Sequence, residues 1–158
     1  MIGNPPYIRQ EEFTTFKPYL SNNFKTFNGT ADLFVYFIEL GIERLKANGE
    51  FIFIVPNKWM KAGYGRNVRE YVMNLNINSI IDFGDLPVFE EASTYPCILS
   101  IKKSNEEESF RAVYIKSLEF QTSLNDYITQ NSFKVNAKSL SESGWTLRNE
   151  IEQKVFNK

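Results

Sequence analysis

The feature that most restricts the fold of this chain is an uninterrupted apolar run at residues 51–55, within a predicted strand at residues 50–55 that directly follows an amphipathic segment. That preceding segment, residues 32–47, repeats its apolar side chains with the period of an α-helix. Asn48 and Gly49 then supply residues that commonly adopt the left-handed conformation at a helix end. A short continuous apolar run is typical of a strand that is covered on both faces. A helix joined at once to such a strand predicts a layered α/β protein.

The same order recurs further along the chain. Residues 66–75 have helical periodicity, and residues 77–83 form a second buried run that ends at a Gly-Asp pair. A third strand is predicted at residues 95–102. Because the intervening loop is too short to contain a crossover helix, this strand is predicted to run antiparallel to the second. Residues 110–115 are predicted to form a further strand at the edge of the sheet.

Composition excludes several kinds of chemistry. The chain has no histidine and a single cysteine, Cys97, so histidine-activated nucleophiles, a disulfide framework and cysteine-rich metal sites are excluded, and we expect no bound metal. The net charge of −1 gives no overall attraction to phosphate. No apolar run approaches the roughly 20 residues that cross a bilayer. We therefore expect a soluble cytoplasmic protein with no membrane partner.

The residues with the clearest chemical meaning are Asn4, Pro5, Pro6 and Tyr7, close to the start of the chain. An exocyclic amine on an aromatic ring is a poor nucleophile, because its lone pair is delocalised into the ring. An Asn side-chain oxygen and an adjacent main-chain carbonyl can accept both amine hydrogens and free that lone pair without a strong base. The two prolines fix the position of the carbonyl, and Tyr7 offers a ring on which a base can stack.

Together with the segments that follow it, this tetrapeptide resembles the gamma-class adenine-N6 DNA methyltransferases of type IIG restriction-modification and phage-defence systems. Residues 2–8 match their (Asn/Asp/Ser)-Pro-Pro-(Tyr/Phe) motif. The resemblance continues through the segments at residues 31–37, 49–59, 80–84, 87–89, 93–98 and 144–147.

The resemblance implies a fold, an activity and partners for the complete enzyme of which this chain would be one part. It implies methyl transfer from S-adenosylmethionine to adenine N6 in duplex DNA, with the target base rotated out of the helix. It assigns residues 4–7 to catalysis, and Tyr7 and Phe89 to the extruded base. The alternative for Phe89 is a buried aromatic residue of the hydrophobic core. We expect the rings of Tyr7 and Phe89 to face one another across a purine-sized cavity where the strands end.

One part of the family pattern is absent from this sequence. The glycine-rich turn that holds the cofactor should precede the tetrapeptide, and Gly63-Tyr64-Gly65 follows no strand that opens onto such a turn. The resemblance therefore implies a partial Rossmann-like methyltransferase sheet, with its last strands antiparallel and the cofactor-binding half missing. Residues 1–117 are assigned to the C-terminal half of the catalytic domain. Residues 118–158, where periodicity weakens and a helix is expected to begin near residue 150, are assigned to a connector toward a missing DNA-recognition domain.

The basic residues of the loop and helix after the first strand are weaker candidates. Lys58, Lys61 and Arg66, with Arg69 beside them, could contact DNA phosphate, although a solvated helix face is the commoner meaning of such a cluster. Trp59 could stack on a base or pack in the core.

Other functions share the same tetrapeptide. Methyltransferases that act on cytosine N4, on ribosomal RNA or on a protein glutamine use it to activate a planar nitrogen. A non-catalytic DNA-binding or scaffold role is an alternative from a different class. The segments after Tyr7 resemble the DNA adenine enzymes more than the RNA or protein enzymes, whereas cytosine N4 stays open.

Overall fold

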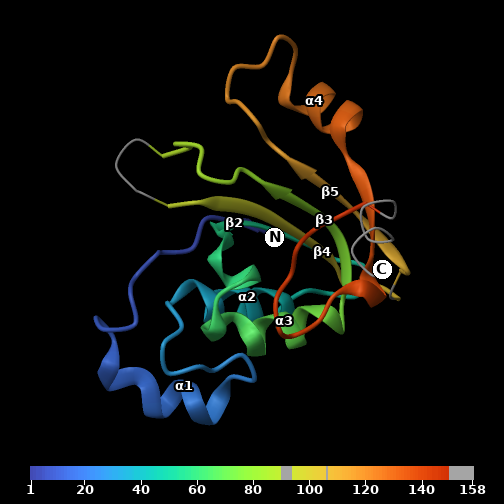
Figure 1. The fold of residues 1–158 in the computed structure, drawn as a ribbon. Helices are drawn as coiled ribbons and strands as arrows, with labels where there is room; N and C mark the ends of the chain where they lie inside the picture. The colour runs from blue at the N-terminus through green and yellow to red at the C-terminus, as the bar shows by residue number, and fades with distance from the viewer. Residues whose placement is uncertain (90–93, 106, 150–158) are drawn as a thin grey trace.

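The computed structural model describes residues 1–89, 94–105 and 107–149, and its centre is one mixed β-sheet (Figure 1). The six strands occur in the order β1-β2-β4-β3-β5-β6. Their bounds are β1 Ile2–Gly3, β2 Glu50–Pro56, β3 Asn76–Asp82, β4 Pro96–Lys102, β5 Ser109–Tyr114 and β6 Phe133–Asn136. The helices are α1 Lys17–Asn23, α2 Phe34–Glu43, α3 Arg66–Met73 and α4 Leu124–Asn131.

The strand directions place several loops at one edge of the sheet. Strands β1 and β2 are parallel, as are β3 and β5, whereas β4 runs antiparallel to both β2 and β3. The predicted antiparallel pair of β3 and β4 is therefore confirmed. Because β1, β2, β3 and β5 all point the same way, their carboxyl ends share an edge, from which the loops after β1 and β3 extend to the left in Figure 1.

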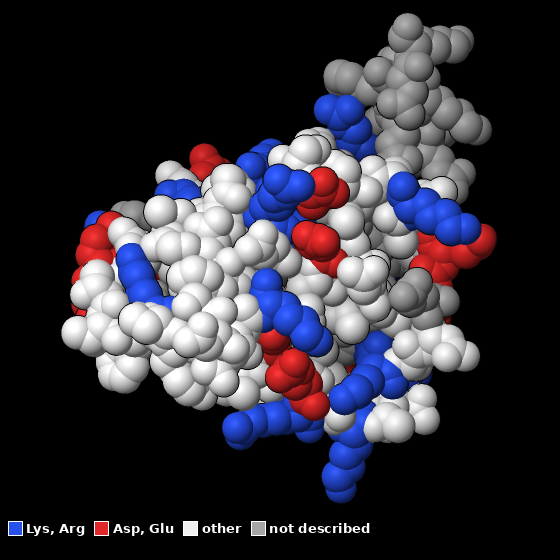
Figure 2. Space-filling model, turned by 90° about the horizontal axis from the view of Figure 1, so that it is seen from below, with Lys and Arg blue, Asp and Glu red and all other residues white. Residues whose placement is uncertain are grey.

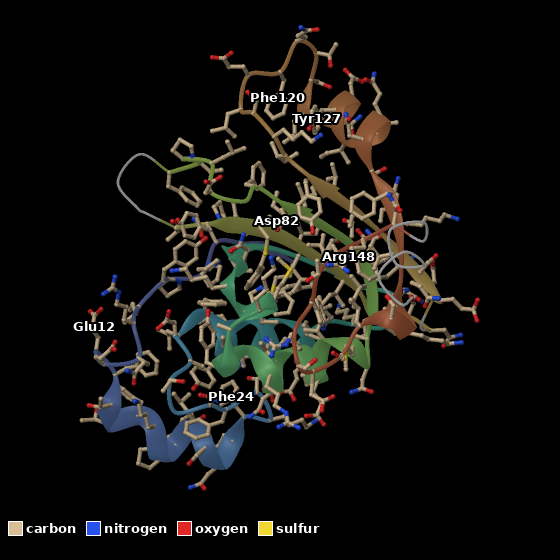
Figure 3. All side chains as sticks on the ribbon, viewed as in Figure 1. Glu12, Phe24, Asp82, Phe120, Tyr127 and Arg148 are labelled. Carbon is tan, nitrogen blue, oxygen red and sulfur yellow. The ribbon has the colours of Figure 1, made fainter. Side chains whose placement is uncertain are left out.

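Helices cover the two faces of the sheet unequally (Figure 1). Helices α2 and α3 lie below it, and the main core forms against the buried side chains of Phe51, Phe53 and Val55. The α4 region covers the opposite face, where Phe120 and Tyr127 lie together above the sheet (Figure 3) and pack on a small core that includes Phe83. The alternate residues of β2 are only half-buried, so the expectation of a strand covered on both faces is wrong for this strand.

The region after residue 117 is more ordered than its sequence indicates. Ser123 and Asp126 form a capping box that begins α4, and β6 pairs antiparallel with β5. The segment at residues 110–115 is thus an inner strand, not the predicted edge strand. The proposed division at residue 117 stays a prediction, although β6 belongs to the same sheet. The helix expected near residue 150 lies outside the described residues.

Within the described parts of the chain, no helix is long and apolar enough to span a bilayer. The same residues contain no cluster of acidic, cysteine or histidine side chains that could hold a metal ion. Cys97 is buried as a free thiol in β4.

Candidate active site at the carboxyl edge of the sheet

The tetrapeptide directly follows β1, where the close packing of two strands fixes its starting point. A Cβ atom at Gly3 would lie 2.7 Å from the ring of Phe53, so a larger residue would require that ring, which packs in the main core, to shift. Asn4 is exposed, Pro5 is buried and Pro6 is exposed. The Asn4 amide therefore stands at the surface on a backbone that the prolines and the packing of Pro5 restrict.

Tyr7 is anchored by its hydroxyl and by its ring. The hydroxyl donates a hydrogen bond to the carbonyl oxygen of Ile54 in β2 at 3.1 Å, and the ring meets Phe34 of α2 edge-on at 6.4 Å. Burial, with a smaller contribution from the nearby Cys97, raises the pKa of Tyr7 to about 12. The hydroxyl is therefore protonated at physiological pH and remains a donor to Ile54.

The rest of this loop is tied to the start of α2. The backbone N–H of Gln10 donates to Asp32 Oδ1 at 3.1 Å, and the N–H of Leu33 donates to the carbonyl of Ile8 at 3.0 Å. These two bonds join the chain on both sides of α1 and hold Tyr7 against Phe34.

Phe89 lies beside Tyr7, as the strand-end argument predicts. The ring centroids are 6.2 Å apart with an interplanar angle of 71°, and Phe89 is half-buried. Rings in edge contact leave no gap for a base between them, so the expected purine-sized cavity between Tyr7 and Phe89 is absent from this structure. Their assignment to base binding stays a prediction, and it requires one of the rings to move.

The loop after β2 forms two short 3-10 turns, Asn57–Met60 and Gly63–Gly65, before α3. Asn57 Nδ2 donates to Asp82 Oδ1 at 2.8 Å, and the same oxygen accepts the N–H of Gly84 at 3.0 Å. Asp82, labelled in Figure 3, thus joins the ends of β2 and β3. These two hydrogen bonds give Asp82 a structural role at the edge of the sheet.

Arg69 holds this loop from within, so its inclusion in a DNA-contacting cluster is wrong. Its side chain is 1% exposed and donates to three main-chain carbonyls, those of Trp59, Ala62 and Glu142. A Cβ atom at Gly65 would lie 1.9 Å from the Trp59 carbonyl oxygen, so glycine is required where the loop closes on Arg69.

The other basic residues of the cluster lie at the surface. Arg66 forms an exposed ion pair with Glu142 at 3.2 Å, Lys61 is exposed, and Lys58 lies with its ammonium 5.3 Å from the ring centroid of Tyr95. On the face drawn in Figure 2, basic and acidic side chains are interspersed and form no continuous basic stripe. Their contact with DNA stays a prediction.

Trp59 is not available for stacking. Its side chain is fully buried, and its ring meets that of Trp145 edge-on at 5.0 Å. The exposed aromatic of this region is Tyr95, which sequence analysis did not single out, because an aromatic residue at the start of a predicted strand is ordinarily part of a core.

The sheet order, with one antiparallel strand between β2 and β3, defines a Rossmann-like methyltransferase fold and confirms the predicted fold class. The modification subunit of a putative type I restriction enzyme from Vibrio vulnificus YJ016 has this fold. It superposes with a TM-score of 0.68 at 20% identity, over 99% of this chain and 39% of that subunit.

The sequence narrows this class to a family. The model of the Eco57I restriction-modification methylase family matches residues 1–89, and the chain belongs to that family. It is 27% identical over 167 residues to the type II restriction enzyme and methyltransferase RM.Eco57I of Escherichia coli, covering 100% of this chain and 16% of the relative. It is 35% identical over 119 residues to the type II methyltransferase M.BstVI of Geobacillus stearothermophilus, covering 72% of this chain and 21% of that relative. The chain thus spans about a fifth or less of the length of these two relatives.

Proposed function

We propose that this chain is the target-base part of a site-specific DNA methyltransferase that transfers a methyl group from S-adenosylmethionine to adenine N6 within a restriction-modification or phage-defence system. The observation that carries the proposal is the exposed Asn4 amide, followed by two prolines at the carboxyl edge of a methyltransferase sheet and by Tyr7, whose ring contacts that of Phe89. Membership of a methylase family supports it.

The residues of this chain activate the amine by hydrogen bonding. Asn4 Oδ1 and the main-chain carbonyl beside it accept the two hydrogens of adenine N6, which draws the nitrogen toward tetrahedral geometry and frees its lone pair. The prolines set the direction of the carbonyl before the base arrives, so little reorganisation is required during the reaction. Tyr7 stacks on the extruded base, and its bond to Ile54 keeps the ring in place.

When bound, S-adenosylmethionine supplies the methyl group, and the described residues fit only a minor part of its site. None of their glycine-rich segments joins a strand directly to a helix, because the Gly63–Gly65 turn follows another 3-10 turn and closes on Trp59 and Arg69. We therefore assign most of the cofactor site to the cofactor-binding half that complements this chain, and the choice of DNA sequence to a recognition domain.

Identification of the methylated nucleoside tests the proposal. The complete methyltransferase that carries this chain is incubated with duplex DNA and isotope-labelled cofactor, and the DNA is digested to nucleosides for mass spectrometry. We expect label in N6-methyladenine at one sequence. Label in N4-methylcytosine would move the activity to the cytosine enzymes, and sequence-specific binding without any transfer would favour the non-catalytic role.

The chain alone provides a second test of the cofactor assignment. Calorimetric titration with S-adenosylmethionine is expected to detect only weak binding, whereas the complete enzyme binds it well. A dissociation constant in the low micromolar range for the isolated chain would contradict the placement of the cofactor site.

A further inference from the structure

Tyr95 presents an exposed ring at the carboxyl edge of the sheet. It directly precedes β4, and its side chain is 40% exposed. The backbone beneath the ring is fixed, because the N–H of Asn57 donates to the Tyr95 carbonyl oxygen at 2.6 Å. The ammonium of Lys58 lies over the ring, 5.3 Å from its centroid. An aromatic ring with a cation beside it is the combination that proteins use to stack a base and contact its phosphate.

A pocket of about 320 Å³ shares two residues with the surroundings of Tyr95, namely Lys58, whose ammonium lies over the ring, and Asn57, which donates to the Tyr95 carbonyl oxygen. Its lining includes the side chains of Asn57, Lys58, Lys61 and Asp82. The hydrogen bond between Asn57 and Asp82 fixes these two side chains, and the lining combines the two cations of Lys58 and Lys61 with the one carboxylate of Asp82. The volume is within the range of pockets that hold small ligands. Its chemistry suits an anion attached to a planar group that can extend over Tyr95.

This pocket and the candidate base site are built on the same elements. Phe89 and Tyr95 belong to the one connection between β3 and β4, and Phe89 contacts Tyr7. On the other side, β2 receives the Tyr7 hydroxyl at Ile54 and continues directly into Asn57 and Lys58. We therefore expect a DNA strand whose target base reaches Tyr7 to pass close to Tyr95.

We propose that Tyr95, Lys58 and Lys61 form a second DNA contact, which binds the nucleotide next to the extruded base. The ring of Tyr95 stacks on that neighbouring base, and the two lysines contact its phosphate. This inference rests on the proposed function and extends it to the flanking nucleotide. Stacking is tolerant of base identity, so the contact adds affinity and holds the distorted strand and does not read sequence.

Photochemical crosslinking tests the location of this contact. A duplex that carries 5-iododeoxyuridine at single positions around the target adenine is irradiated with the complete enzyme, and the modified peptide is identified by mass spectrometry. We expect an adduct on Tyr95 when the iodinated base is adjacent to the target, and its loss in Tyr95→Ala. The matched control is Tyr19→Ala, which removes an exposed tyrosine from α1 and should leave the adduct unchanged. No adduct on Tyr95 from any position would overturn the proposal.

Equilibrium binding gives an independent measurement. Loss of one stacked base predicts that Tyr95→Ala weakens DNA binding about 5- to 150-fold, whereas Tyr95→Phe, which keeps the ring, binds as the unchanged enzyme does. Lys58→Gln should reduce the slope of log affinity against log salt by about 0.9. Lys134→Gln, at an exposed position in β6, should leave that slope unchanged.

The two proposals fail in different ways. If the enzyme methylates adenine but Tyr95→Ala changes neither DNA binding nor crosslinking, the second DNA contact is wrong and the proposed function stands. If the Tyr95 adduct forms but no methyl group is transferred, the second DNA contact stands and the proposed function is wrong.

Discussion

The loops that follow β1 and β2 leave the sheet at the same edge, yet they are held in place in opposite ways. The start of the loop after β1 is restricted by the covalent geometry of Pro5 and Pro6, and its Asn4 amide remains at the surface, whereas hydrogen bonds hold the loop from Tyr7 onward. The loop after β2 is fixed by Arg69, whose buried guanidinium donates to carbonyls inside the protein. Restriction of the backbone by proline rings leaves the polar groups of Asn4 available for a substrate, whereas the guanidinium of Arg69 is occupied by carbonyls of the protein.

Asn4→Ala in the complete enzyme is expected to have the largest effect on function. Removal of one acceptor for the N6 hydrogens should lower turnover by about 100- to 1,000-fold, as loss of a comparable oriented hydrogen-bonding group does in other enzymes. The thermal midpoint should be unchanged, because the Asn4 side chain is exposed. Single-turnover kinetics with labelled cofactor would measure the effect. Near-normal turnover would break the contrast between the two loops, because Asn4 would then have no chemical role.

Arg69→Met should have the largest effect on stability. The substitution keeps much of the side-chain volume but removes the donor to the buried carbonyl of Trp59 and to the part-buried carbonyls of Ala62 and Glu142, which we expect to cost about 3 kcal/mol of unfolding free energy. Urea unfolding would measure it. Arg66→Met is the control, since loss of its exposed ion pair should change stability by less than about 1 kcal/mol. Equal effects at the two positions would contradict the assigned role of Arg69.

Tyr7→Phe is expected to have a smaller effect. The ring and its stacking surface are retained, and only the hydrogen bond to Ile54 is lost, at about 1 kcal/mol of unfolding free energy. Comparison with Tyr19→Phe at an exposed position isolates the contribution of that bond. No difference between the two variants would show that the prolines alone position the tetrapeptide.

Lys61→Gln should have the smallest effect on stability, and it compares an exposed basic residue of the loop after β2 with the buried Arg69 that holds the same loop. Lys61 is exposed, so its loss should leave unfolding unchanged. If Lys61 contacts a DNA phosphate, the salt dependence of binding should fall by a slope of about 0.9. An unchanged slope would show that this lysine is only a solvated side chain.

The sequence predicted the parts of the fold that depend on local patterns. The order of α2, β2, α3, β3 and β4 follows from periodicity and loop length, and the meeting of Tyr7 with Phe89 follows from strand direction. Strand β6 was missed because only Val135 among its four residues is buried. Helix α4 was missed although the Ser123 and Asp126 capping box was a readable signal.

The role of Arg69 could not be predicted, because its acceptor at Glu142 lies 73 residues away in the sequence. Four basic residues lie close together in the sequence, namely Lys58, Lys61, Arg66 and Arg69. In the structure Arg69 is buried, whereas the other three lie at the surface. The orientation of the Tyr7 and Phe89 rings likewise depends on packing, which strand direction does not determine.

The contact of Trp59 with Trp145 makes the chain a spectroscopic reporter of one junction. These are the two tryptophans of the sequence, and both are buried where the segment at residues 141–147 packs on the loop after β2. The N–H of Trp145 also donates to the carbonyl of Met60 at 2.7 Å. Intrinsic tryptophan emission of this chain therefore originates entirely at this junction, so a change in wavelength or intensity on DNA binding would indicate that the junction had moved.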